Sequence, residues 1–283
     1  MKLGMIAVLW LALSAGVALA EPVAMVTDVQ GGVTALDGGK TAKVELLSYL
    51  EPGAALQLEP RAHLTITFFS KPVEYRFVGP ARLKVEQERI VSQDGKAEAH
   101  AVSLQKSSAA KKFTVAQRES VTQAAFEMRG LRAGLRLDDP VDTRLLDGEE
   151  LAFRWEGPRP RDGYQLNLYK GHDRLLQQAV ATGNTWAPPA GLLKAGEVYE
   201  WEVRTALDNG EVLTARGSFS VADSAAAKSV KSQAPAAGAT FSERVLYAVF
   251  LEQQGFRCDA RKLWRELSRE RPDDVVAKEH SVR

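Results

Sequence analysis

The stretch 199–203, Tyr-Glu-Trp-Glu-Val, decides the fold of this chain, because large apolar residues alternate in it with carboxylates. A period of two residues is typical of a β-strand with one buried and one solvated face. The residues Asp208-Asn209-Gly210 follow it and precede a second apolar pair, Val212 and Leu213. Asn and Gly tolerate the positive φ that a type I′ turn requires, so the sequence predicts a β-hairpin at this point.

The same alternation recurs elsewhere in this half of the chain. Apolar side chains occupy alternate positions in the segments 151–155, 164–168 and 219–221. Together with the hairpin they predict about seven short strands over residues 138–222. This pattern, with a core tryptophan, resembles an immunoglobulin-like or fibronectin type III β-sandwich, and the resemblance implies two packed sheets. Because Cys258 is the only cysteine, a disulfide-linked antibody-type domain is excluded.

The segment 21–115 has short apolar runs separated by turn-forming residues and shows no sustained helical period. Apolar residues alternate at 54–58 and 64–68, and glycine pairs mark turns at 31–32 and 38–39. Short, evenly spaced strands of this kind predict a β domain built as a sandwich, a barrel or a β-solenoid roll.

Three pieces of this segment, in this order, resemble the periplasmic FecR-like domain. They are Val29-Gln30-Gly31-Gly32-Val33 in the first strand, Leu50-Glu51-Pro52-Gly53-Ala54-Ala55-Leu56, and Ala62-His63-Leu64-Thr65-Ile66. The chain departs from the family at Phe69-Ser70-Lys71-Pro72, where a turn with Asp, Gly and Ser usually follows. The resemblance covers residues 23–103 and implies a β-rich periplasmic module.

The two segments that follow the β domains have different patterns. In 116–137, apolar residues at helical spacing, broken by Gly130 and Gly134, predict a short helical connector, with a further strand and a polar loop as the alternative. The segment 223–239 is rich in Ala, Ser, Lys, Pro and Gly, and Val230 is its one large apolar residue. This composition predicts a flexible linker, because it buries too little apolar surface to fold.

Residues 240–275 return to helical spacing. Small and apolar residues and a proline fall at the spacings of one tetratricopeptide repeat, at Ala248, Leu251, Gly255, Ala260, Trp264, Leu267 and Pro272. We expect a tetratricopeptide-like helical hairpin followed by a tail at 276–283, although Arg244 replaces the usual aromatic residue. A single repeat cannot bury its open face, so it must dock on the sandwich or on a partner. The candidate partner-binding residues are Leu251, Phe256 and Trp264.

Residues 1–20 have the pattern of a secretory signal peptide. Lys2 supplies a positive start, an apolar run extends from Leu3 to Val17, and Ala18 and Ala20 are small residues at a cleavage site. This run is short for a membrane span, and no later run is long enough to cross a bilayer. We expect a soluble periplasmic protein without a membrane anchor, exported through a cleaved signal peptide.

The sequence carries no signature of catalysis. It has no GxSxG, HExxH, P-loop, GxGxxG or CxxC pattern. Its four histidines, His63, His100, His172 and His280, lie in different predicted units, so no metal site is expected from them. Cys258 is expected to be a small, half-buried apolar residue, with a reactive thiol as the alternative. We therefore expect no enzymatic activity and no cofactor.

Two functions remain, neither involving nucleic acid, because the formal net charge is only +1. The first is a non-enzymatic scaffold that binds an envelope protein in signalling or assembly. FecR-like proteins that regulate sigma factors carry a cytoplasmic segment and a membrane anchor, which are not expected here, so their signalling role is not implied. The alternative is a carbohydrate- or peptidoglycan-binding accessory protein that recognises cell-wall glycan. Its candidate sugar-stacking residues are Trp186, in a loop-like context, and Tyr169.

Overall fold

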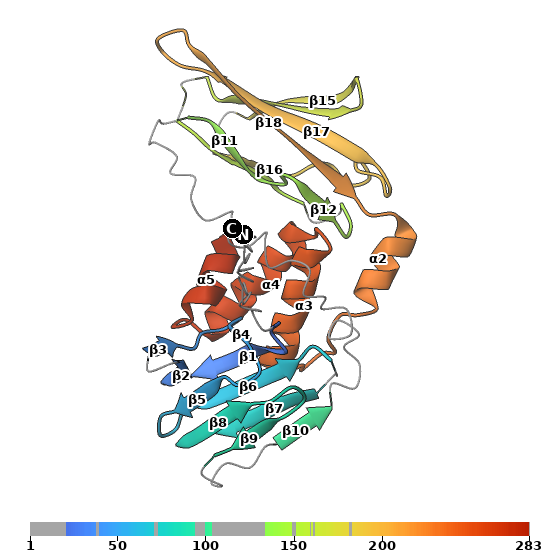
Figure 1. The fold of residues 1–283 in the computed structure, drawn as a ribbon. Helices are drawn as coiled ribbons and strands as arrows, with labels where there is room; N and C mark the ends of the chain where they lie inside the picture. The colour runs from blue at the N-terminus through green and yellow to red at the C-terminus, as the bar shows by residue number, and fades with distance from the viewer. Residues whose placement is uncertain are drawn as a thin grey trace, which may run out of the picture.

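The computed structural model describes residues 21–37, 40–70, 73–93, 100–103, 134–148, 151–158, 160, 162–180 and 183–282. These residues form two β domains with a group of helices between them (Figure 1). The predicted signal peptide, residues 104–115 of the first predicted domain and most of the predicted helical connector lie outside the described residues. The last two connector residues, Arg136 and Leu137, belong to a strand.

The first β domain consists of two five-stranded antiparallel sheets. One contains β1 (Ala24–Gln30), β4 (Tyr49–Leu50), β6 (His63–Phe68), β7 (Val73–Val78) and β10 (His100–Ser103), in the order β10-β7-β6-β1-β4. The other contains β2 (Val33–Asp37), β3 (Lys40–Lys43), β5 (Ala55–Leu58), β8 (Ala81–Val85) and β9 (Ile90–Ser92), in the order β3-β2-β5-β8-β9. Successive strands such as β5 and β6 lie in different sheets, so the chain crosses repeatedly between the layers.

One hydrophobic core joins these two sheets. Leu56 and Leu58 of β5 and Leu64 and Ile66 of β6 are all buried in it, as their alternation predicts. Gly31 connects β1 to β2 with a φ of 79°, in the left-handed region that glycine adopts without strain. The prediction of a mainly β structure in this part of the chain is confirmed.

The second β domain pairs a three-stranded sheet with a five-stranded one. The first contains β11 (Arg136–Asp139), β13 (Phe153–Glu156) and β16 (Thr185–Trp186), in the order β11-β13-β16. The second contains β12 (Thr143–Leu145), β14 (Tyr164–Lys170), β15 (Asp173–Val180), β17 (Val198–Ala206) and β18 (Val212–Val221), in the order β12-β18-β17-β14-β15. Trp155 and Trp201 are fully buried in one core with apolar residues of both sheets, which is compatible with a β-sandwich.

The hairpin predicted around 208–210 is confirmed, but its type I′ turn is wrong. Leu207 N donates to Glu211 O at 2.8 Å and encloses three residues instead of two. Among these, only Gly210 has a positive φ, at 83°. The Asn209 carboxamide oxygen instead accepts a hydrogen bond from Glu211 N at 2.9 Å. A three-residue loop needs a left-handed residue at its last position alone, so Asn209 does not have to adopt a positive φ.

The C-terminal part is helical, with more helix than the sequence pattern predicts. The predicted hairpin is present as α3 (Phe241–Gln253) and α4 (Arg257–Glu270), and α3 begins at a capping box formed by Thr240 and Glu243. A further helix, α5 (Val275–Val282), occupies most of the segment that the sequence pattern left as a tail. Asp274 starts this helix by accepting a hydrogen bond from Ala277 N at 2.8 Å.

The segment predicted as a flexible linker contains the helix α2 (Ser224–Lys231), so the prediction that it does not fold is wrong there. Asp223 accepts a hydrogen bond from Ala226 N at 2.8 Å and caps the helix. Val230 is buried in the same apolar cluster as Phe241 of α3. An alanine-rich segment has a high helix propensity, so one cap and one buried anchor are sufficient here.

Candidate binding groove

The helices contact the first β domain through a buried polar cluster. Glu74 of β7 is fully buried, and its carboxylate accepts hydrogen bonds from Arg76 Nε at 2.6 Å and from Ser242 Oγ of α3 at 2.8 Å. Thr27 Oγ1 of β1 lies 2.7 Å from the same Ser242 oxygen. Leu246 packs on Met25 beside this cluster. A buried carboxylate is stable only when it is paired, so the cluster holds α3 against the sheet.

The helices contact the second β domain through α4 and the residues before it. Arg144 N of β12 donates to Gly255 O at 2.8 Å, and Leu146 N donates to the Asp259 carboxylate at 3.1 Å. Asp139 of β11 forms an ion pair with Arg261. The two hydrogen bonds and the ion pair each join residues more than 100 positions apart in the sequence. The helices therefore connect two domains that sequence alone leaves separate.

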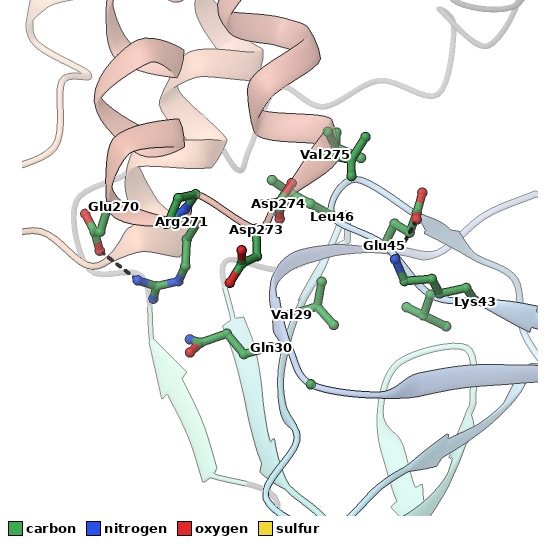
Figure 2. A pocket seen from close by; sticks show the side chains of 14 residues that line it. Val29, Gln30, Lys43, Glu45, Leu46, Glu270, Arg271, Asp273, Asp274 and Val275 are labelled. Carbon is green, nitrogen blue, oxygen red and sulfur yellow. Dashed lines mark hydrogen bonds and ion pairs between the residues drawn. The ribbon is translucent and has the colours of Figure 1, made fainter.

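Between the first β domain and the loop that joins α4 to α5 lies a groove of about 460 Å³ (Figure 2). One wall is the end of β1 with Val29, Gln30 and Gly31, and another is the segment 43–46. The third wall is formed by residues 270–276, the end of α4, the loop after it and the start of α5. In Figure 2 the Asp273 side chain extends from this loop toward Gln30. The groove therefore exists only when the helices are docked.

The β1 wall of this groove is an unpaired strand edge. β6 pairs with one side of β1 along its whole length, whereas β4 pairs with the other side only at Ala24 and Met25. Two further hydrogen bonds join Val26 to Leu47 and Ser48, both at 2.9 Å. Beyond Val26, no strand among the described residues pairs with this edge, and Val29 and Gln30 at its end line the groove. An unpaired edge is a ready template for another extended segment.

The groove is acidic overall. Its charged lining residues are Lys43, Glu45, Glu270, Arg271, Asp273 and Asp274, four carboxylates against two bases. Lys43 Nζ lies 3.1 Å from Glu45, and Arg271 Nη1 lies 3.3 Å from Glu270. Both bases are thus matched by neighbouring acids, which leaves the Asp273-Asp274 pair as the source of the negative charge. Apolar residues, among them Val29, Leu46 and Val275, complete the lining.

Arg271 connects the groove loop to β1. Its guanidinium lies 3.5 Å from the Asp28 carboxylate and 4.6 Å from the centroid of the Phe241 ring. Burial raises the pKa of Asp28, and the nearby guanidinium opposes this shift. The ion pair therefore holds the loop at a site where the carboxylate is costly to bury.

The residues predicted to bind a partner lie inside the helical unit. Leu251, Phe256 and Trp264 are all buried in the same apolar cluster, and Trp264 Nε1 donates to Glu252 Oε1 at 3.0 Å. The open face that they were expected to present is covered by α5 and the β domains. None of the three is accessible to a partner in this structure, so their placement corrects the prediction. The lone hairpin docks within its own chain.

The two candidate sugar-stacking residues lie on different surfaces of the second β domain. Trp186 of β16 is half-buried and packs on Phe153, with ring centroids 5.5 Å apart, so it covers the edge of the core. Tyr169 of β14 is also half-buried, but it lies on the outward side of the five-stranded sheet. The Arg216 guanidinium lies 5.5 Å from its ring centroid. Of the two, Tyr169 alone faces away from the core.

Cys258 is buried at the contact between α4 and the second β domain. Its Sγ lies 3.1 Å from Asp139 Oδ1. Burial, together with the neighbouring Asp139 carboxylate, raises the pKa of this thiol to about 12. The thiol is therefore protonated at neutral pH, and a nucleophilic cysteine is not supported.

Sequence reasoning did not identify Asp28, Arg271 or the groove. The one local signal is Asp273-Asp274 after Pro272, an acidic pair where a helix ends. Among the described residues, no helix is long and apolar enough to cross a membrane. In the same part of the chain, no group of three His, Cys, Asp or Glu side chains is placed to hold a metal ion.

Comparison with known proteins adds no family to this description. No protein-family model matches the chain, and no curated protein is significantly similar to it in sequence, so its function is inferred from the groove itself.

Proposed function

We propose that this protein is an exported, non-enzymatic scaffold that binds an extended, basic segment of an envelope protein in the groove beside β1. The observation that carries this proposal is the unpaired edge at the end of β1, where Val29 and Gln30 line a groove walled on three sides. A partner strand that pairs there gains main-chain hydrogen bonds, which is the recognition mode called β-augmentation.

The size of the open edge sets the length of the bound segment. Three residues of β-strand extend about 10 Å, so three or four partner residues pair with β1. Apolar side chains at Val29, Leu46 and Val275 favour small apolar side chains on the partner. Val275 is 53% exposed, so it contributes apolar surface that is still available for burial.

The charge of the groove selects a basic segment. Asp273 is exposed at the rim, and the two lining bases already lie beside acids. A lysine or arginine of the partner therefore meets uncompensated negative charge, whereas an acidic segment is repelled.

At the level of fold, we propose a FecR-like first domain and an immunoglobulin-like second domain. For the second, the support is its strand order: β11 pairs with β13 in one sheet, and β12, directly after β11, runs parallel to β18 in the other. Two sheets packed around a buried tryptophan are also typical of sandwiches of this class. For the first domain, the support is the motif order in 23–103 and the paired sheets. The helical hairpin is proposed to be tetratricopeptide-like.

We further propose that the protein acts in the periplasm. The support is the signal pattern of residues 1–20, with its positive start, apolar run and small residues at the cleavage site. The absence of catalytic sequence patterns and the paired, buried state of Cys258 support a binding role over an enzymatic one.

The proposal is tested by selecting ligands from a display library of short random peptides with the full mature chain. We expect enrichment of basic peptides, and slower amide hydrogen exchange at 28–30 when a selected synthetic peptide is bound. Asp273→Lys should weaken binding at least tenfold by reversing the charge at the rim. Asp208→Lys is the matched control, because Asp208 is exposed in the turn between β17 and β18. Enrichment of acidic peptides, or equal weakening by both variants, rules out the groove as the site.

A further inference from the structure

The outward side of the five-stranded sheet of the second domain is a continuous polar surface. Leu166 of β14 and Trp201 of β17 point into the core. Side chains alternate along a strand, so the residues next to these two in each strand point outward. Strand register aligns Gln177, Asn167, Glu202 and Arg216 in one row across four strands. We call this row and its two neighbouring rows the outer face.

The neighbouring rows add one aromatic ring and further polar groups. On one side, register aligns Arg174, Tyr169, Glu200 and Ser218. On the other side, it aligns Ala179, Gln165, Arg204 and Thr214. Arg216 packs against the Tyr169 ring and fixes its orientation. An aromatic ring held among amides, hydroxyls and guanidinium groups has the composition of a surface that stacks on and hydrogen-bonds to sugars.

The centre of the outer face contains polar groups that are buried although they point outward. Asn167 is 3% exposed and Glu202 is 7% exposed. Glu202 accepts hydrogen bonds from Arg216 Nη2 at 3.0 Å and from Asn167 Nδ2 at 3.2 Å. The carboxamide oxygen of Asn167 has no hydrogen-bond partner among the described residues. A buried acceptor without a partner is costly, so a ligand hydroxyl that reaches it is favoured. Gln177 is exposed on β15 directly opposite Asn167, so its flexible side chain borders this acceptor.

The charges of the outer face indicate an acidic ligand. The two acids of the outer face, Glu200 and Glu202, form ion pairs with the same base, because Arg216 lies 3.0 Å from Glu202 and 3.9 Å from Glu200. Arg174 and Arg204 are exposed, and within the described part of the chain no carboxylate lies within ion-pair distance of either. Two unmatched guanidinium groups therefore flank the central row, and guanidinium recognises carboxylates in a bidentate manner.

The separation of these two arginines indicates a polymer. They lie four residues apart along the strands and two strands apart across the sheet, which places their backbones about 16 Å from each other. A ligand that reaches both is extended and carries more than one acidic group. With only three arginines against two glutamates, the face is too weakly charged for nucleic acid, whose affinity depends on many phosphate contacts.

We propose that the outer face is a binding site for an extended, carboxylate-bearing polysaccharide. Arg174 and Arg204 pair with its carboxylates, Tyr169 stacks on a sugar ring, and the Asn167 oxygen accepts a hydroxyl proton. This site is separate from the groove, so it does not depend on the proposed function.

The test measures binding of the full mature chain to polygalacturonate, to its methyl ester, to purified peptidoglycan and to single-stranded DNA, by affinity electrophoresis or pull-down. We expect binding to polygalacturonate, to peptidoglycan or to both, which distinguishes a uronate polymer from cell-wall glycan as the source. The methyl ester, which keeps the sugar and lacks the charge, should bind at least tenfold more weakly than polygalacturonate.

Two variants assign the binding to the outer face. The double variant Arg174→Gln, Arg204→Gln should reduce acidic glycan binding at least tenfold, and Tyr169→Ala should also reduce it. The matched control is Arg82→Gln, Arg89→Gln, which removes two exposed arginines from the first domain. Circular dichroism checks that all variants are folded. The proposal is overturned if no acidic glycan binds, if the control loses as much affinity, or if DNA binds as tightly as the glycans.

Discussion

The two contacts of the helical unit are built differently. In the contact with the first domain, Glu74 is fully buried and has one guanidinium partner, Arg76, besides the hydroxyl of Ser242. In the contact with the second domain, Asp139 has two guanidinium partners, Arg261 and Arg265, and it also contacts the Cys258 thiol. Main-chain hydrogen bonds to Gly255 and Asp259 add to the second contact.

This difference indicates where each contact is vulnerable. A buried acid with one cationic partner is left uncompensated when that partner is removed, which is strongly destabilising. An acid with two cationic partners keeps a countercharge when one is lost. Among the described residues, the buried carboxylate of the first contact therefore depends on one cation, whereas the buried carboxylate of the second contact keeps a countercharge when one of its two cations is lost.

The largest effect is expected from Trp264→Ala, which breaks both contacts at once. The ring is fully buried in the helical unit, and its removal should cost about 4 kcal/mol of unfolding free energy. Since α3 holds one domain and α4 the other, hydrogen exchange should accelerate in both β1 and β12. Trp186→Ala is the control, expected to affect the second domain alone. Protection of β1 that survives Trp264→Ala would show that the helices do not hold the first domain.

The next largest effect separates the two contacts. Arg76→Ala leaves the buried Glu74 without a cation and should cost about 3 kcal/mol. Arg261→Ala leaves Arg265 beside Asp139 and should cost only about 1.5 kcal/mol. Denaturant unfolding of the two variants measures this ranking. Equal losses, or a larger loss from Arg261→Ala, would contradict the idea that the number of cations decides the strength of each contact.

A smaller effect tests whether the contacts open independently. Cys258 is the only cysteine, and its burial and raised pKa make its alkylation by a maleimide slow in the folded protein. Arg261→Ala should accelerate alkylation at least tenfold by weakening the contact with the second domain. Ser242→Ala acts on the other contact and should change the rate little. If Ser242→Ala accelerates alkylation as strongly, the two contacts open together.

The smallest expected effect concerns the groove loop and pH. Burial raises the pKa of Asp28 above its ordinary value of 3.8, so the folded state favours the protonated carboxyl. The stability that this group contributes is present below pH 3.8 and is lost as pH rises through the folded pKa. Asp28→Asn should flatten that dependence, changing stability at pH 7 by less than about 1 kcal/mol. Unfolding midpoints between pH 3.5 and 7 measure it, and a dependence as steep as that of the unaltered protein would contradict the assignment. Glu88→Gln, exposed in the first domain, is the control.

Local sequence patterns were sufficient to predict most of the strands and helices. Alternation around Trp201 and around Leu64 identified strands that are present, and the spacing from Ala248 to Leu267 identified the helical hairpin. The same reasoning failed at α2, where composition suggested disorder, because the burial of Val230 depends on the distant Phe241. It also failed for Leu251, Phe256 and Trp264, because spacing shows which face of a helix is apolar but not what covers it.

The candidate sites depend on residues that no local pattern connects. Thr27 and Ser242 are 215 positions apart, and Asp28 and Arg271 are 243 positions apart, yet each pair is in contact. By itself the sequence determined strand alternation, helix spacing and the signal pattern, because these are properties of neighbouring residues. The tertiary structure alone decided that the helices lie between the two β domains and leave the end of β1 unpaired. Burial and charge pairing between residues of the two β domains and the helices produce that arrangement, and no short stretch of chain encodes these contacts.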